Sequence, residues 1–338
     1  MENGPQIRTI GNASHEEKEK ARQEFLQRLF SHFDSLNIEE RNQLEEFEYP
    51  KTEKELACID FANKETNELM KDAGIEPYDI PVENFHIIPS ELYKKAYRGS
   101  GVAVATIRQQ GILFNGDVFR DNPAHFGVVA LHETLHLKSH LSLEVKERGE
   151  KIKTTPYRHG VSVLSLQEYD KRQEFHEHFR GLHEAIVSVQ EKKSFTKFLE
   201  SPWMSEERKW LLSDEAQSLK KDVSQKKGIP EDDIIWVGKK DKEDWETVSY
   251  PKQRMVLDLV CKEIQEQFPE QYQNSDEVFK EFLKSHFTGQ LLHIARLVEK
   301  TFGEGSFRVL GNMGTDKSSG VLHLETLKKA RMRQMRSQ

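Results

Sequence analysis

Apolar side chains recur at helical spacing in two segments near the start of the chain. A helix is predicted over residues 14–33, because Ser14 and Glu17 have the spacing of a capping box and a stripe rich in Phe and Leu follows. A second helix is predicted over 52–73, where the pattern stops at Gly74. Both stripes indicate packing helices with no chemistry of their own.

Short β-rich runs replace this pattern after Pro77, and helical spacing returns over residues 122–144. The runs are rich in β-branched and aromatic residues and bounded by Gly, Pro and Asn, which predicts strands over 85–88, 101–107 and 111–115. Strands that lead directly into such a helix indicate an α+β fold with a small mixed sheet.

The remaining chain is predicted to be mostly helical. Residues 145–156 are charged and loop-like, and 158–164 can form one more strand. Helical spacing then predicts long helices over 170–199, 250–268 and 275–302, the last interrupted near Gly289.

These patterns divide the chain into consecutive parts. We expect a disordered N-terminus, a helical N-terminal region, an α+β domain, a helical C-terminal subdomain and a basic tail, over residues 1–13, 14–76, 77–200, 201–310 and 311–338. The tail holds six basic and two acidic residues, which is typical of a solvated segment. A contact between this tail and nucleic acid or membrane is the less favoured alternative.

The composition indicates a cytoplasmic protein. Of 338 residues, 36% are hydrophobic and 32% charged, which suits a protein rich in solvated helices, and the net charge of −7 gives no sign of nucleic-acid binding. No apolar run is long enough for a membrane span, and the first residues lack the apolar core of a signal peptide. Cys58 and Cys261 lie in apolar segments and are expected to be buried free thiols.

The predicted helix over 122–144 contains the motif HETLH at residues 132–136. Side chains four residues apart lie on one face of a helix, so His132 and His136 can bind one metal ion. Glu133 can reach a water on that metal without being a ligand. Solvated histidines on an outer face are the alternative. It is less favoured, because the helix is apolar nearly all round and buried polar groups need partners.

A catalytic zinc ion needs a third protein ligand, and His140 does not qualify. On a straight helix His132, His136 and His140 rise by about 6 Å per four residues, so they cannot converge on one ion. A glycine turn solves this problem in the extended form of the motif, but Ser139 and Ser142 stand where the glycine and last histidine are required.

Glu184 is the predicted third ligand. It is the sole carboxylate in the otherwise uncharged run over 181–189, and a lone buried carboxylate needs a cationic partner. Pairing with Arg158, Arg180 or a core histidine is the alternative. Three nearby acids lie in charge-rich turns and are expected to be solvated: Glu174, Glu177 and Glu191.

Other histidines are less favoured as ligands. His176 and His178 are two apart on a predicted helix, so they point to different faces and do not share a metal. His125 lies two turns before His132 and is a weak candidate for a residue that supports a ligand.

The motif HETLH on one helix, followed by the glutamate of GLHEAIVS on a second helix, resembles the gluzincin group of zinc metallopeptidases over roughly residues 80–195. The resemblance implies a zincin-like fold, with a small sheet, an active-site helix and a helical C-terminal part. His183 departs from the group's pattern, in which Asn is usual, and the acid that ends that pattern is missing.

This resemblance implies that His132, His136 and Glu184 hold Zn²⁺. Glu133 then takes a proton from the zinc-activated water and passes it to the leaving amine.

A donor to the developing oxyanion is also expected. Tyr250, with Arg254 one helical turn later, is the first choice, and Tyr157 and His159 are the alternatives. Plain packing of Tyr250 before a helical proline is the simpler interpretation of that residue.

The sequence is therefore compatible with three candidate functions. The first is a zinc-dependent peptidase, either an endopeptidase or an aminopeptidase, acting on a peptide or protein that can pair with a strand edge beside the metal. The second is a non-catalytic zinc- or peptide-binding module, and the third is a helical interaction protein with a chance motif. The intact Glu133 and the candidate third ligand favour the first.

Overall fold

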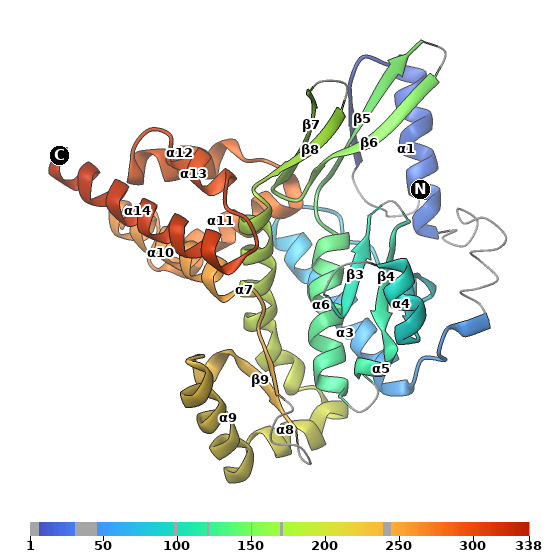
Figure 1. Cartoon of the computed structure of the whole chain (residues 1–338), viewed down its shortest axis with the longest axis vertical. Helices are drawn as coiled ribbons and strands as arrows, with labels where there is room; N and C mark the ends of the chain where they lie inside the picture. The colour runs from blue at the N-terminus through green and yellow to red at the C-terminus, as the bar shows by residue number, and fades with distance from the viewer. Residues whose placement is uncertain are drawn as a thin grey trace.

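The computed structural model describes residues 7–30, 46–97, 101–107, 109–119, 122–149, 151–169, 172–238 and 245–337. Within these residues the fold is mixed α+β, as the sequence predicts (Figure 1). The strands are β1 Ile7–Ile10, β2 Phe85–Ile88, β3 Ala103–Thr106, β4 Gly111–Asn115, β5 Leu141–Arg148, β6 Lys151–His159, β7 Ser162–Tyr169, β8 Arg172–His178, β9 Ile234–Val237 and β10 Trp245–Thr247. None of the helices in the described ranges is both long and apolar enough to cross a membrane.

The helices alternate with these strands at first and then dominate the chain. They are α1 His15–Phe30, α3 Glu53–Asp72, α4 Ser90–Ala96, α5 Gly116–Phe119, α6 Pro123–Leu137, α7 Arg180–Leu199, α8 Ser205–Leu211, α9 Asp214–Lys227, α10 Pro251–Gln267, α11 Ser275–Thr288, α12 Leu292–Phe302, α13 Ser306–Gly311 and α14 Lys317–Ser337.

The first two predicted helices form where their capping residues indicate. Ser14 Oγ accepts a hydrogen bond from the backbone N–H of Glu17, at the start of α1. Thr52 and Glu55 make both reciprocal bonds of a capping box, at the start of α3. Helix α3 then packs against α6, so it covers the helix that carries the histidine motif.

A three-stranded sheet in the order β2-β4-β3 lies against α6. Strand β2 pairs parallel with β4, and β3 pairs antiparallel with it, so the predicted mixed sheet is present. Strand β3 is an edge of this sheet, on the side that faces α6 and the candidate site.

A second sheet, in the order β1-β5-β6-β7-β8, corrects several expectations (Figure 1). Ile7–Ile10 is not disordered, because it pairs parallel with β5; residues 1–6 lie outside the described residues. The expected loop over 145–156 is a pair of long strands, and part of the expected helix over 170–199 is strand β8. Helix α7 begins at Arg180, after Phe179 in a left-handed conformation.

Helix α6 is also shorter than predicted. It ends at Leu137, and the apolar residues Leu141, Leu143 and Val145 alternate along strand β5 with their side chains buried. This spacing of two is that of a strand with one buried face.

The chain after Pro202 is mostly helical, and the predicted helix over 275–302 is divided at Gly289 into α11 and α12, as expected. The segment 311–338 is not a solvated tail. Its helix α14 packs on α10, Leu327 is fully buried, and Arg331 pairs with Glu263 at 2.7 Å.

The largest hydrophobic cluster joins residues from Leu29 to Leu327, whereas the buried apolar residues of β1 and β5 pack with α1 in smaller separate clusters. The predicted division into domains therefore stays a prediction. Cys58 and Cys261 are buried and unpaired, as expected.

Candidate metal centre

Helix α6 carries both histidines of the motif in its last turns. It begins as predicted, with the side chain of Asn122 accepting a hydrogen bond from the backbone N–H of His125 at 3.0 Å. Pro123 follows in the first turn, where a missing N–H breaks no helical hydrogen bond. Nearly every side chain of α6 is buried, so His132 and His136 need polar partners.

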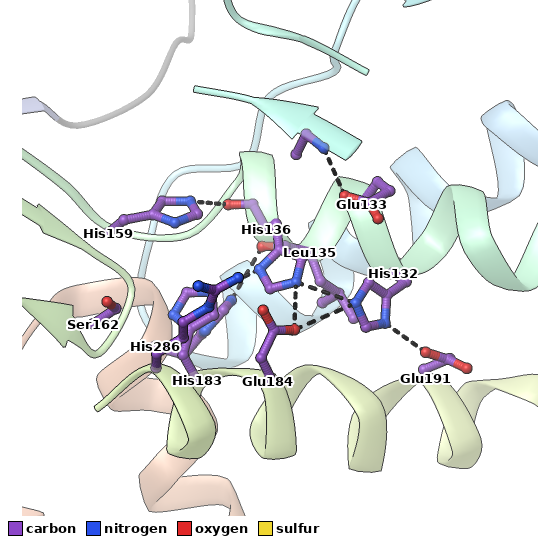
Figure 2. A network of polar contacts seen from close by, with 12 residues as sticks. His132, Glu133, Leu135, His136, His159, Ser162, His183, Glu184, Glu191 and His286 are labelled. Atoms are coloured by element: carbon purple, nitrogen blue, oxygen red, sulfur yellow. Dashed lines mark hydrogen bonds and ion pairs between the residues drawn. The ribbon is translucent and has the colours of Figure 1, made fainter. Parts of the chain in front are cut away.

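Helix α7 runs beside α6 and brings Glu184 to the two histidines (Figure 2). Nε2 of His136 lies 3.2 Å from Nε2 of His132 and 3.2 Å from Oε2 of Glu184. Nε2 of His132 lies 3.7 Å from the same carboxylate oxygen. The three predicted ligands thus meet at one place. Of the alternative partners considered for Glu184, the structure shows histidines, His132 and His136, and neither Arg158 nor Arg180.

This triangle has the size that a zinc ion requires. The point equidistant from its three corners lies about 2.0 Å from each of them, which matches the zinc–nitrogen and zinc–oxygen distances of protein sites. Two imidazoles and one carboxylate are also the donor set of a catalytic zinc, with one position left for water or substrate. The residues therefore fit the ion.

The surroundings shift the pKa values of His132 and Glu184 in opposite directions. Burial acts to lower the pKa of His132, but the carboxylates of Glu184 and Glu191 hold that pKa well above its usual value. Burial acts to raise the pKa of Glu184, but His136 and His132 hold it well below its usual value. Glu184 is thus ionised, as a metal ligand must be.

Glu191 contacts the side of the His132 ring that faces away from Glu184, so the prediction that Glu191 lies in a solvated turn is wrong. The carboxylate of Glu191 is buried, and its Oε2 lies 2.6 Å from Nδ1 of His132. A carboxylate on the far nitrogen of a metal-binding histidine fixes the ring and its tautomer. Glu191 lies seven residues after Glu184, about two helical turns, so both side chains lie on one face of α7. That spacing could have identified it.

His183 contacts the ring nitrogen of His136 that faces away from Glu184. It occupies the position where the gluzincin pattern usually has Asn. Nδ1 of His136 and Nε2 of His183 are 2.7 Å apart. His136, His159 and His183 together also have the spacing of a second metal cluster. The distance of 2.7 Å is shorter than the roughly 3.3 Å between two nitrogens that bind one tetrahedral zinc, so this contact is a hydrogen bond.

Glu133 lies beside the ligand triangle without belonging to it. Its Oε2 accepts a hydrogen bond from the backbone N–H of Ala105, in strand β3, at 2.7 Å. The second carboxylate oxygen is left for a proton. The expected role of Glu133 toward a metal-bound water stays a prediction.

A cavity of about 760 Å³ opens over these residues. Strand β3 forms one wall, and the segment before α10 and the start of α7 form others; the walls include Ala103, Ala105, Arg180 and Tyr250. The carbonyl of Val102 accepts from Asn115 in β4, so the alternate residues Ala103 and Ala105 direct their backbone groups away from β4, toward the cavity.

Tyr250 lies in the cavity wall with its ring 6.4 Å from that of His132, between centroids. Its backbone is left-handed, with φ of 53°, directly before Pro251. Burial raises the pKa of the phenol, and Glu184 and Glu133 add to the effect, so the hydroxyl keeps its proton and can donate.

Arg254 supports the segment before Tyr250 and does not line the cavity. Its guanidinium makes two hydrogen bonds to Asp233, at 3.0 and 2.7 Å, and its Nε donates to the carbonyl of Ser249. Of the alternatives to Tyr250, His159 lies in the cavity wall but contacts the carbonyl of His136 at 2.7 Å, and Tyr157 is not among the lining residues.

The remaining histidines lie apart from the ligands. His140 follows the end of α6, and its Nε2 lies 2.9 Å from Ser142 Oγ. His125 lines the cavity near Glu246, at 3.4 Å. His176 and His178 are on strand β8 and not on a helix, so they share a face; neither belongs to a metal-ligand cluster within the described ranges.

The chain has no counterpart in three comparisons with known proteins: no family model, curated protein or solved structure matches it.

Proposed function

We propose that this protein is a zinc-dependent metallopeptidase with a zincin-like catalytic site. The observation that carries the proposal is the convergence of His132, His136 and Glu184 in the wall of a cavity, at distances that suit one zinc ion. Bound there, zinc would supply a water molecule of lowered pKa and polarise a carbonyl.

The surrounding side chains suit the other parts of peptide hydrolysis. Glu133 is the proposed general base, because it lies beside the ligands and keeps one carboxylate oxygen uncommitted. Tyr250 is the proposed donor to the developing oxyanion, because its protonated hydroxyl belongs to a residue of the cavity wall. Glu191 and His183 hold the two histidines in place.

The edge of β3 supports an extended peptide as the substrate. Ala103 directs its N–H and C=O into the cavity, and Ala105 its C=O, since the N–H of Ala105 already donates to Glu133. An added strand uses such groups for main-chain hydrogen bonds. A peptide paired with this edge runs past Glu133, because Glu133 is hydrogen-bonded to the same strand.

A library of internally quenched peptides tests the proposal with the zinc-loaded full chain. We expect cleavage by the wild type and a loss of about 10²- to 10⁴-fold in Glu133→Gln, which keeps its zinc. Glu304→Gln removes an exposed carboxylate and is the matched control, with wild-type activity.

A zinc- or peptide-binding module without turnover is the second candidate, favoured by the hydrogen bond that holds Glu133 to β3. In that case the wild type binds peptides and zinc but cleaves none. We also propose a cytoplasmic location, which the two buried free cysteines support.

A further inference from the structure

A row of buried histidines leads from the candidate metal centre into the protein interior (Figure 2). His136 contacts His183 through a ring nitrogen, and the rings of His183 and His286 have centroids 4.9 Å apart. These residues come from the separate helices α6, α7 and α11. At 3% and 0% exposure, His183 and His286 are shielded from solvent.

The hydrogen-bond partners assign a tautomer to each ring. With Nε2 of His136 as a metal ligand, its proton is on Nδ1, which donates to Nε2 of His183 at 2.7 Å. A neutral imidazole carries one proton, so His183 bears its proton on Nδ1. Nε2 of His286 lies 3.1 Å from the carbonyl of Leu135, to which it can only donate, so Nδ1 of His286 is an acceptor.

The free donor and the free acceptor lie near one point, although no hydrogen bond joins them in this structure. Nδ1 of His183 and Nδ1 of His286 are both buried without a hydrogen-bond partner among the described residues. They lie 2.6 and 3.0 Å from the point that a Cβ atom on Gly160 would occupy. Unpaired buried polar atoms are costly, and a hydrogen bond between these two complementary atoms would remove that cost.

We propose that His183 and His286 are positioning residues of the metal centre, forming with His136 one directional hydrogen-bonded chain that closes beside Gly160. The chain holds His136 in the tautomer that leaves Nε2 free for the metal, and it ends on the backbone of α6 at Leu135. Gly160 is required because any side chain there would separate the two Nδ1 atoms. The inference rests on the proposed zinc site.

Zinc affinity, measured by competition with a chelator, tests whether the three histidines form this hydrogen-bonded chain. We expect the dissociation constant to rise about 10- to 100-fold in His286→Phe, which removes the acceptor. His286→Asn keeps an acceptor oxygen near the position of Nδ1 and should restore most of the affinity. Equal losses in both variants, or wild-type affinity in His286→Phe, would overturn the proposal.

Alanine substitutions at Gly160 and Gly149 form a matched pair that tests the role of Gly160. Gly160 and Gly149 both have positive φ, of 56° and 63°, but only Gly160 has neighbours at its Cβ position. Alanine strains the backbone at both sites, so Gly160→Ala should weaken zinc binding and Gly149→Ala should not. Equal affinities in the two variants contradict the account.

Histidine-selective ¹⁵N NMR of the zinc-loaded wild type provides a test that needs no variant to fold. The proposed hydrogen-bonded chain of histidines requires a proton on Nδ1 of His183 and on Nε2 of His286. The opposite tautomer of His183 would overturn it. Failure of the proposed zinc site can be distinguished from failure of the histidine chain. If the zinc site is wrong, the wild type binds no zinc or Glu184→Ala retains it.

Discussion

Oε2 of Glu191 lies 2.6 Å from Nδ1 of His132, which places a buried carboxylate directly behind the first histidine of the motif. Two carboxylates of helix α7 therefore approach opposite nitrogens of one imidazole ring, Glu184 toward Nε2 and Glu191 at Nδ1. The first has the position of a metal ligand, and the second orients the ring.

Replacement of Glu191 by Gln should weaken zinc binding by about 10- to 100-fold, because an amide holds the imidazolium or imidazole N–H less strongly than a carboxylate does. The dissociation constant for zinc, from chelator competition, measures this effect. Glu200→Gln changes an exposed glutamate at the end of the same helix and should leave the constant unchanged. Equal constants in Glu191→Gln and the wild type would contradict the role of this contact.

Tyr250→Phe removes the proposed donor without removing its ring. We expect kcat to fall about 10²- to 10³-fold with a small change in KM, because the hydrogen bond strengthens as the oxyanion forms. Peptide cleavage by the zinc-loaded protein measures both constants. Tyr272 does not line the cavity, and Tyr272→Phe is the control expected to retain activity. Full activity in Tyr250→Phe would leave Tyr250 a packing residue.

Gly127→Ala should destabilise the fold by about 1–3 kcal/mol through overpacking. A Cβ atom at Gly127 would lie 2.1 Å from Cζ of Phe198, which α7 packs against α6. Denaturant unfolding measures the loss. In a double-mutant cycle, Phe198→Leu should cost less in the Gly127→Ala background than in the wild type, and additive effects would contradict this contact.

Acid should destabilise the protein in part through His140. Burial, with Arg158 and Arg8 nearby, lowers the pKa of His140 to about 4, below the usual 6.5. Between these values the unfolded chain binds the proton and the folded chain does not, so stability is full above pH 6.5 and falls toward pH 4.

The measurement is the free energy of unfolding at pH 7 and pH 5. The wild type should lose about 2 kcal/mol more over this interval than His140→Asn. Equal pH dependence of the two proteins would show that His140 does not contribute.

Local signals explain what the sequence could predict. The capping residues of α1, α3 and α6, the apolar spacing of the helices and the short strands before α6 all act within a few residues. Glu184 stood out because its neighbours are uncharged, whereas Glu191 was missed because Lys192 and Lys193 follow it. When its sequence neighbours are charged, a single buried carboxylate on one face of a helix cannot be recognised from the local sequence.

The five-stranded sheet could not be predicted in the same way. The pairing of β1 with β5 joins residues about 130 positions apart, which no local pattern encodes. Strand β6 is charged and only partly buried, so its residues resemble a loop in sequence. The spacing of Leu141, Leu143 and Val145 was the available sign of a strand.

The contacts of His183 and His286 depend equally on tertiary structure. They bring together helices α7 and α11, whose histidines show no shared pattern along the chain.

The proposed zinc site is tested most directly by the metal content of the protein purified without chelators, measured beside His132→Ala and Glu184→Ala. We expect one zinc ion per chain in the wild type and a strong reduction in both variants. Absence of zinc from the wild type after zinc is supplied, or unchanged zinc in Glu184→Ala, would contradict it.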